Sequence, residues 1–552
     1  MNLWQVRIRP KKLEVEVEER VKRFQQENLL RRLQQRDFRL WSSRLLPEIT
    51  DRLGWLDLPE RSRVILPRLK EFAAEIREDG VEAVYLLGMG GSSLAAEVLA
   101  ATWKSQPDSL PLRVVDSTHP TFIKEISQNC ADRKTLFIVA SKSGTTLETL
   151  ALFRYFWELK SQEENFPGSH FVAITDEATP LEKLALERGF RAVFHAPADV
   201  GGRFSALSVF GLLPAALVGI NLEELVELAR QERNRIFSES SPPSKKAEDD
   251  VLNYLAFFSL LGEARDKLTF FTSRKLESFP DWLEQLISES LGKDGQGLVP
   301  VSREPSLSSP AYSADRAFIY LGLKDESPAF SLEKLSFQAE DGPPLLEIYL
   351  PDLIYLGAEM FRWEVCVALL GSWLGVHPFN QPDVVLAKVL TREMLEKESI
   401  SIPKSESIRI TEENKLKASW ATWLASLQPG DYISLQAWLP PTADILGRLQ
   451  QIRKIILAKT GTATCLGFGP RFLHSTGQLH KGGPNKGVFL QLIDEPEDDL
   501  PVPETPYSFG RLIRAQADGD FLALKQRGRR VLRINLGPEV AQGLALLERL
   551  IS

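Results

Sequence analysis

Small hydroxyl-bearing side chains are concentrated in one short segment of the sequence, SKSGTT at residues 141–146. The apolar run 135–140 before it is typical of a buried strand, and the run after it carries apolar residues at helical spacing. A loop between a strand and a helix start can bind an anion, because free backbone N–H groups and the helix dipole point to the same place. Further donors are available from Ser141, Lys142, Ser143, Thr145 and Thr146. From the loop alone, a polar connection capped by a hydroxyl is the alternative.

A glycine-rich segment, GMGGSS at residues 88–93, also separates an apolar run from a helical pattern. Glycines allow a backbone to approach a ligand closely, and Gly91 and Ser92 are the candidate donors here. The spacing is not GxGxxG and no Gly-Lys-Ser/Thr follows, so neither a dinucleotide site nor a P-loop is predicted. A tight turn is the alternative. Because both loops follow strands that we expect to be adjacent in one sheet, the sequence predicts a single phosphate group between them.

One arginine and one glutamate are candidates for stabilising charge and for moving a proton. Arg203 follows two glycines directly ahead of an apolar helix. A positive charge at a helix start opposes the helix dipole, so an anion that the arginine contacts explains its position better. Such an arginine could stabilise charge that develops on a substrate oxygen, and an ion pair at the surface is the alternative. Glu289 lies near a predicted helix end, where a lone glutamate is more typical of solvated surface.

The composition argues against several classes of function. The chain has 552 residues, which predicts two or three domains, and its formal net charge of -7 argues against nucleic acid or an acidic membrane surface as the main partner. The three cysteines are far apart and form no CxxC pair, as expected in a reducing cytoplasm. The histidines show no HxxxH or HExxH spacing, so no metal site is predicted. The apolar stretch 353–376 is interrupted by charged residues and fits a buried helix better than a membrane span.

The elements that position these loops follow one another as strand, loop and helix from residue 82 to residue 196. Such alternation predicts a parallel sheet covered by helices, with its ligands at the carboxyl ends of the strands. A second region of the same kind begins near residue 265. We therefore predict an α/β protein with two doubly wound parallel-sheet domains and helices on both faces of each sheet. The predicted division is an N-terminal helical extension (1–50), a first domain with the phosphate loop (51–262) and a second domain (263–552).

Five motifs spread over residues 88–388 resemble those of the phosphoglucose isomerase family. They are GMGGSSLAAE (88–97), SKSGTTLET (141–149), VGGRFSALS (200–208), ESLGKDG (289–295) and HPFNQPDVVLAK (377–388). The segment 41–60 and the long C-terminal region look more like the isomerase half of fused transaldolase–isomerase proteins, although no transaldolase barrel precedes the motifs. The resemblance implies two sugar-isomerase-type (SIS) domains, with the catalytic glutamate in the second.

The resemblance also implies a reaction, the reversible isomerisation of glucose 6-phosphate and fructose 6-phosphate through a cis-enediol, without a cofactor or a metal. Carried over to this chain, Glu289 moves the proton between carbon 2 and carbon 1, and Arg203 stabilises the enediolate oxygens. Lys388 and Gln381 contact the sugar during ring opening. The phosphate is held by Gly91, Ser92, Ser141, Lys142, Ser143, Thr145 and Thr146.

Ring opening needs a proton transfer, which the family assigns to a histidine between the glutamate and the terminal lysine. In this sequence that interval contains only His377, at a position where the family more often has asparagine. The segment HSTGQ at 474–478 resembles the family's histidine motif, yet it follows the lysine motif instead of preceding it. We assign ring opening to His474, with His480 as the second candidate, and a structural role to His377.

Two alternatives to this isomerase stay open. A non-catalytic sugar-phosphate-binding protein of the SIS type would keep the 141–146 loop, but it would not need Arg203, Glu289 and Lys388 together. An isomerase of another sugar phosphate, of mannose or of an amino sugar, would keep all of them. The resemblance further implies a cytoplasmic protein that forms a homodimer and associates with a transaldolase. No nucleic acid or membrane partner is expected.

Overall fold

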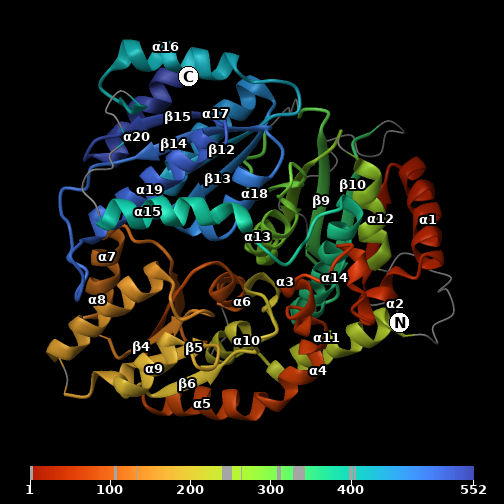
Figure 1. The fold of residues 1–552 in the computed structure, drawn as a ribbon, viewed down its shortest axis with the longest axis horizontal. Coiled ribbons are helices and arrows are strands. Elements are labelled where there is room, and N and C mark those ends of the chain that lie inside the picture. The colour runs from red at the N-terminus through yellow and green to blue at the C-terminus, as the bar shows by residue number, and fades with distance from the viewer. Residues whose placement is uncertain are drawn as a thin grey trace.

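The protein is built on three five-stranded sheets, each covered by helices (Figure 1). The computed structural model describes residues 4–552 with the exception of 105–108, 132, 164, 239–250, 263, 308–311, 327–341, 397–401 and 403–405. The strands of the sheets alternate with helices along the chain, and nearly all of them run parallel. The predicted α/β class is therefore confirmed.

The first sheet is entirely parallel and has the order β3-β2-β4-β5-β6. One of its faces shares a hydrophobic cluster with helices α5, α6 and α10, and the other face shares a second cluster with α7, α8 and α9. Strands β2 and β4 are buried along their whole length, as expected for parallel strands covered on both faces. They are adjacent and in register at their carboxyl ends, so the loops that follow them lie side by side.

The elements of this first unit have the following bounds: α5 (Leu66–Glu78), β2 (Ala83–Gly88), α6 (Leu94–Trp103), β3 (Leu112–Val115), α7 (Pro120–Cys130), β4 (Thr135–Ala140), α8 (Leu147–Glu163), β5 (Phe171–Thr175), α9 (Pro180–Glu187), β6 (Ala192–His195) and α10 (Val209–Leu217).

The second sheet has the order β1-β10-β9-β7-β8 and is parallel except for β1, which pairs antiparallel with β10. The N-terminal region, predicted as a helical extension, thus contributes an edge strand, and its helix α1 packs against α12. The bounds are β1 (Gln5–Arg9), α1 (Lys11–Gln26), α12 (Val251–Leu261), β7 (Lys267–Thr272), α13 (Phe279–Leu291), β8 (Val299–Val301), β9 (Arg316–Leu323), β10 (Leu345–Leu350) and α14 (Leu356–Leu374).

The third sheet has the order β11-β15-β14-β12-β13 and is entirely parallel. The sequence pattern predicts one sheet over 263–552, whereas this range holds most of the second sheet and all of the third. Two helices, α14 and α15, follow one another before strands and helices alternate again from β11, and this pattern gives no clear signal that a new sheet begins. The domain boundaries stay predictions.

The bounds in this last part of the chain are α15 (Val385–Glu396), β11 (Ile408–Arg409), α16 (Glu413–Ala425), β12 (Tyr432–Trp438), α17 (Ala443–Thr460), β13 (Ala463–Phe468), the 3-10 helix η13 (Arg471–His474), α18 (Gly477–Gly482), β14 (Gly487–Ile493), α19 (Phe509–Gln526), β15 (Arg530–Asn535) and α20 (Val540–Ile551).

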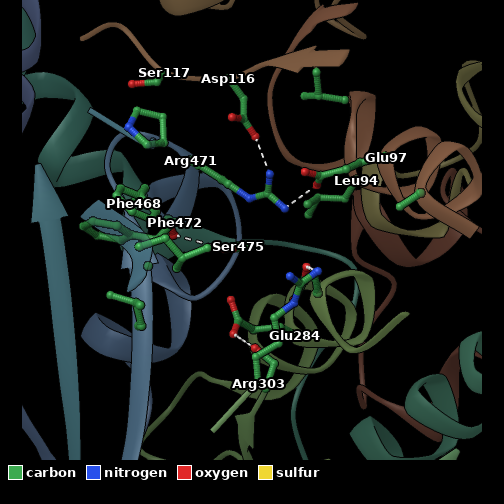
Figure 2. Close-up of a pocket in the computed structure, with 18 of the residues that line it drawn as sticks. Leu94, Glu97, Asp116, Ser117, Glu284, Arg303, Phe468, Arg471, Phe472 and Ser475 are labelled. Carbon is green, nitrogen blue, oxygen red and sulfur yellow. Dashed lines mark hydrogen bonds and ion pairs between the residues drawn. The ribbon is translucent and has the colours of Figure 1, made fainter. Parts of the chain in front are cut away.

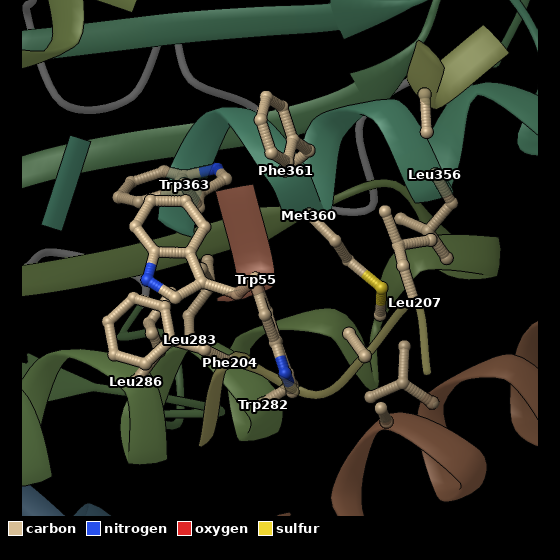
Figure 3. Close-up of a cluster of buried hydrophobic side chains, with 14 of the residues drawn as sticks. Trp55, Phe204, Leu207, Trp282, Leu283, Leu286, Leu356, Met360, Phe361 and Trp363 are labelled. Atoms are coloured by element: carbon tan, nitrogen blue, oxygen red, sulfur yellow. The ribbon is translucent and has the colours of Figure 1, made fainter. Parts of the chain in front are cut away.

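One hydrophobic cluster joins the first and second sheets and fixes the loop that carries Arg203 (Figure 3). The fully buried Trp55 stacks on Phe204 with ring centroids 5.0 Å apart, and it meets Phe361 of α14 at 6.0 Å. Trp282 of α13 lies in the same cluster. Because such a core is close-packed, the backbone next to Arg203 has little freedom to move.

Among the helices that the structure describes, not one combines the length and the apolar character needed to cross a membrane. Within the same described residues, no group of three or more histidine, cysteine, aspartate and glutamate side chains is arranged to hold a metal ion.

Candidate active site

The SKSGTT loop connects β4 to α8 and forms one wall of a cavity of about 580 Å³. Ser141 is buried, and its Oγ atom lies 2.8 Å from Oγ1 of Thr146. Gly144 has a φ of +66°, and a Cβ atom there would lie 2.8 Å from the backbone nitrogen of Leu181, so a glycine is required. Ser143, Thr145 and Thr146 line the cavity, together with the first turn of α8. Hydroxyl groups and a helix start therefore face the same space, as the sequence predicted.

Lys142 does not line this cavity. Its Nζ atom pairs with Oδ2 of Asp176 at 2.5 Å and donates to the carbonyl oxygens of Pro197 and Ala198 at 3.3 Å. Burial lowers the pKa of Lys142, although the hydrogen bond and the charge of Asp176 oppose this shift. The Lys142 side chain thus stabilises the loop from outside the cavity. Its position gives it no direct contact with a phosphate inside the cavity.

The glycine-rich loop packs between the Arg203 loop and the segment that carries His474. A Cβ atom on Gly91 would lie 2.2 Å from the carbonyl carbon of Gly202, so the two backbones can approach this closely only because residue 91 is a glycine. The hydroxyl of Ser205 donates to the carbonyl oxygen of Gly91 at 3.1 Å. A Cβ atom on Gly90 would lie 2.6 Å from the carbonyl oxygen of His474. Ser92 ends the 3-10 turn Gly90–Ser92 in this loop and is partly buried.

Arg203 and Glu289 form a buried ion pair at the junction of the first and second sheets. The NH1 atom of Arg203 lies 3.4 Å from Oε1 of Glu289, and the two side chains are only 4% and 12% exposed. Burial lowers the pKa of Arg203, while the charge of Glu289 opposes the shift. The guanidinium also donates to Oγ of Ser290 at 2.9 Å and to Oε1 of Gln381 at 2.9 Å. With further bonds to the carbonyl oxygens of Pro378 and Asn380, Arg203 is held in one orientation.

Gln285, which the sequence did not single out, connects Glu289 to His474. It lies one helical turn before Glu289 on α13, and its Nε2 atom donates to Oε2 of Glu289 at 3.0 Å. The same Nε2 atom donates to the carbonyl oxygen of His474 at 2.7 Å. The signal in the sequence was the spacing of four residues, which puts both side chains on one face of a helix.

His474 meets a carboxylate across the cavity. Its Nε2 atom lies 3.0 Å from Oε1 of Glu148, in the first turn of α8, and Nε2 of Gln516 donates to the same oxygen at 2.7 Å. Burial alone would raise the pKa of Glu148, but His474 and, further away, Lys388 hold it below its ordinary value. Glu148 is part of the SKSGTTLET motif, although the sequence gave no separate reason to choose it. Nothing in the sequence around Gln516 indicated that it would contact Glu148.

The remaining predicted residues fall into two groups. Lys388 lies on α15 and lines the cavity, whereas Gln381 contacts Arg203 instead. His480, the second candidate for ring opening, is buried against the ring of Phe489 at 5.1 Å, and burial lowers its pKa well below the ordinary value. His377 is also buried, and its Nδ1 atom accepts the backbone N–H of Phe379 at 3.1 Å. Both are packed as structural histidines.

Glu289 and Arg203 are not among the described residues that line the 580 Å³ cavity. They lie next to it, joined through Gln285 to the backbone of His474, whose ring does line it. The arrangement thus provides a carboxylate paired with an arginine, a histidine paired with a carboxylate, and a hydroxyl-rich loop. Such a set can anchor an anionic group, open a hemiacetal ring and move a proton next to a carbonyl.

Comparison with known families agrees with this geometry. Residues 61–300 match the family model described as phosphoglucose isomerase. The glucose-6-phosphate isomerase of Caldanaerobacter subterraneus subsp. tengcongensis is 29% identical over 385 residues, which cover 60% of this chain and 84% of that protein. The glucose-6-phosphate isomerase of Staphylococcus aureus (strain Mu3) is 29% identical over 385 residues, covering 61% of this chain and 85% of the relative.

Two solved structures share the fold. A hypothetical protein from Thermus thermophilus aligns with a TM-score of 0.59 and 27% identity, covering 71% of this chain and 100% of the other. A glucose-6-phosphate isomerase from Chlamydia trachomatis aligns with a TM-score of 0.54 and 18% identity, covering 70% of this chain and 87% of the other. At 18% identity, the second alignment shows only that the fold is shared.

Proposed function

We propose that this chain, a member of the phosphoglucose isomerase family, interconverts glucose 6-phosphate and fructose 6-phosphate. The observation that carries the proposal is the chain of contacts Arg203–Glu289–Gln285–His474–Glu148, which ends beside the hydroxyl loop 141–146. A family match explains why the motifs are present, and the contacts bring together residues up to 326 positions apart, as joint action on one sugar requires.

The phosphate group is the anchor of the substrate in this proposal. The hydroxyls of Ser143, Thr145 and Thr146 and the N-terminus of α8 face the cavity, and Lys388 of α15 brings a positive charge to the same lining. Binding energy from a group that does not react can orient the group that does. The phosphate therefore fixes the sugar so that its reactive end points towards His474 and Glu289.

His474 opens the ring in this proposal. Nε2 of His474 is paired with Glu148, which orients the ring. His474 gives a proton to the ring oxygen, the C1 hydroxyl gives its proton to water, and the bond between C1 and the ring oxygen breaks. The product of this step is the open-chain aldehyde.

Glu289 then transfers the proton. Its carboxylate takes the proton from carbon 2, the electron pair forms the double bond between carbons 1 and 2, and the oxygen on carbon 1 becomes anionic. Arg203, held by Ser290 and Gln381, stabilises that charge. A proton then passes from oxygen 2 to oxygen 1, the carboxylic acid of Glu289 returns its proton to carbon 1, and the new double bond between carbon 2 and oxygen 2 gives the ketose. The residues donate and accept protons only, so oxidation states balance within the sugar.

A coupled assay tests the proposal. Purified protein is given fructose 6-phosphate, and glucose 6-phosphate is detected by its dehydrogenase. We expect turnover, and the same assay format with mannose 6-phosphate and glucosamine 6-phosphate tests the alternative substrates. Binding of fructose 6-phosphate without turnover, measured by calorimetry, would instead support the non-catalytic sugar-phosphate-binding protein and contradict the proposal.

We further propose that the protein acts in the cytoplasm as a homodimer and associates with a transaldolase. The three cysteines are free and buried, which fits a reducing compartment, and the likeness of segment 41–60 and the C-terminal region to fused transaldolase–isomerase proteins supports the partner. Sedimentation velocity of the protein alone and mixed with a transaldolase tests both points. A monomer at micromolar concentration, or two boundaries that do not interact, would contradict them.

A further inference from the structure

A second cavity, of about 430 Å³, lies where elements of the three sheets meet (Figure 2). Its walls come from α6 and the end of β3 in the first unit, from α13 in the second, and from β13, η13 and α17 in the third. Two of these elements, α13 and η13, also carry Glu289 and His474. Arg471 points into this cavity from the third unit towards the first (Figure 2).

Arg471 ties the third unit to the first through two carboxylates. Its NH1 atom lies 2.8 Å from Oδ2 of Asp116, which follows β3, and its NH2 atom pairs with Glu97 on α6. These partners are 355 and 374 positions away in sequence, so the contacts are tertiary. Burial would lower the pKa of Arg471, but Glu97 and Asp116 hold it well above its ordinary value. The guanidinium is therefore charged and bound at both ends of its fork.

The ion pairs of Arg471 lie very close to His474 along the chain. Arg471 is the first residue of η13 and His474 is the last, and between them Phe472 is buried against the ring of Trp438 at 5.3 Å. At the far end, the carbonyl oxygen of His474 accepts from Gln285 at 2.7 Å, and its ring meets Glu148 at 3.0 Å. A Cβ atom on Gly90 would lie 2.6 Å from that carbonyl oxygen, so the backbone of His474 lies directly against this glycine.

We infer that Arg471 is a positioning residue of the isomerase, which sets the place of His474 by binding Glu97 and Asp116. The inference rests on the proposed function, because it concerns the ring-opening step. Arg471 touches neither the sugar nor the reacting atoms. It fixes the backbone between Arg471 and His474, three residues further along the chain, so that His474 contacts Glu148 of the first unit.

The test compares two arginine variants in the same cavity. Arg303 also lines it and pairs with Asp281 at 2.6 Å, but it belongs to the loop after β8 and has no contact with His474 among the described interactions. We expect Arg471→Met to lower kcat for glucose 6-phosphate about ten- to hundredfold with KM changed less than about threefold, the scale of a misplaced catalytic group. Arg303→Met should stay within about twofold of the wild type.

A second substrate separates a role through His474 from a general loss of structure. Erythrose 4-phosphate cannot close a ring, because its O4 carries the phosphate, so its isomerisation bypasses ring opening. We expect Arg471→Met to lose much less activity on erythrose 4-phosphate than on glucose 6-phosphate. Equal losses on both substrates, or an Arg471→Met variant as active as Arg303→Met, would overturn the inference.

Two further variants keep the test decisive if Arg471→Met does not fold. Arg471→Lys keeps the charge and reaches one carboxylate, so it should recover most of the activity on glucose 6-phosphate. Asp116→Asn removes one of the two carboxylates that bind Arg471, and it should show the same preference for the open-chain substrate in weaker form. If both variants act equally on the two substrates, the inference is wrong. A wild type without turnover would contradict the proposed function itself, which the Arg471 variants alone do not.

Discussion

The Nε2 atom of His474 lies 3.0 Å from the Oε1 atom of Glu148, although the two residues are 326 positions apart in sequence. The histidine comes from the third sheet and the glutamate from the helix that follows the phosphate loop of the first. In the proposed mechanism, the contact joins the part of the site that would hold the phosphate to the part that would open the ring.

We expect His474→Asn to reduce turnover of glucose 6-phosphate about a hundredfold, because general acid–base catalysis by one residue is worth that much or more. Its effect on erythrose 4-phosphate should be small. Steady-state kinetics on both substrates measures the difference. His195→Asn serves as control, since His195 pairs with Glu182 on the surface of the first unit. A His474→Asn variant that opens the ring at the wild-type rate would remove this residue from the mechanism.

Gln285→Leu keeps the size of the side chain and removes the amide that bridges Glu289 and His474. We expect kcat to fall at least about tenfold, and the free energy of unfolding to fall by about 1–3 kcal/mol, because two buried acceptors lose their donor. Kinetics and urea denaturation check both values. The control is Glu284→Gln at the adjacent position, whose side chain faces the second cavity. Unchanged kcat in Gln285→Leu would show that the bridge is dispensable.

Thr145→Val and Ser143→Ala test the phosphate loop. Each removes a hydroxyl that faces the cavity, and loss of one hydrogen bond to a charged group is worth about 1.5–3 kcal/mol. We expect kcat/KM for fructose 6-phosphate to fall about ten- to hundredfold, mainly through KM. Ser161→Ala, on the helix α8 that follows the loop but bonded to the carbonyl oxygen of Trp157, is the matched control. Equal KM values in all three variants would place the phosphate elsewhere.

Much of this site followed from the sequence because its motifs are local. Residues 88–93 and 141–146 are strand–loop–helix connections, so their neighbouring positions in one sheet were predictable, and β2 and β4 are indeed adjacent. Lys142 differs from the prediction because Asp176, on a neighbouring loop, binds it. No local pattern could reveal that partner.

What the sequence could not predict depends on contacts between distant elements. Alternating strands and helices look the same whether they extend one sheet or begin another, so the third sheet was missed. The order of the motifs made His474 an uncertain choice, and only its contact with Glu148 explains how a histidine beyond the lysine motif reaches the site. Gln516 binds the same glutamate from α19, and nothing near it in the sequence indicates this.

His377 should make stability depend on pH. Burial, with the charges of Lys293 and Arg203, lowers its pKa from 6.5 to about 4. The unfolded chain therefore binds a proton that the folded protein does not, and the free energy of unfolding should decrease as the pH falls from about 6.5 to about 4. The full loss is at most about 3 kcal/mol, from 1.36 kcal/mol per pKa unit.

His377→Asn isolates this effect, because its amide oxygen can replace Nδ1 as the acceptor for the N–H of Phe379. Urea denaturation of both proteins at pH 7.5 and pH 5 should show a smaller decrease for the variant. An equal decrease in both would mean that His377 does not contribute to the acid sensitivity.

The central claim is that the carboxylate of Glu289, held by Arg203 and Gln285, moves a proton between carbon 2 and carbon 1. The most direct measurement is the reaction of glucose 6-phosphate in D₂O, followed by NMR of carbon 1 in fructose 6-phosphate. The wild type should place solvent deuterium at carbon 1 in those turnovers in which the carboxylic acid of Glu289 exchanges its proton with solvent before returning it. Glu289→Gln should form fructose 6-phosphate, with or without deuterium, at least about a hundredfold more slowly. An undiminished rate of isomerisation in Glu289→Gln would contradict the account.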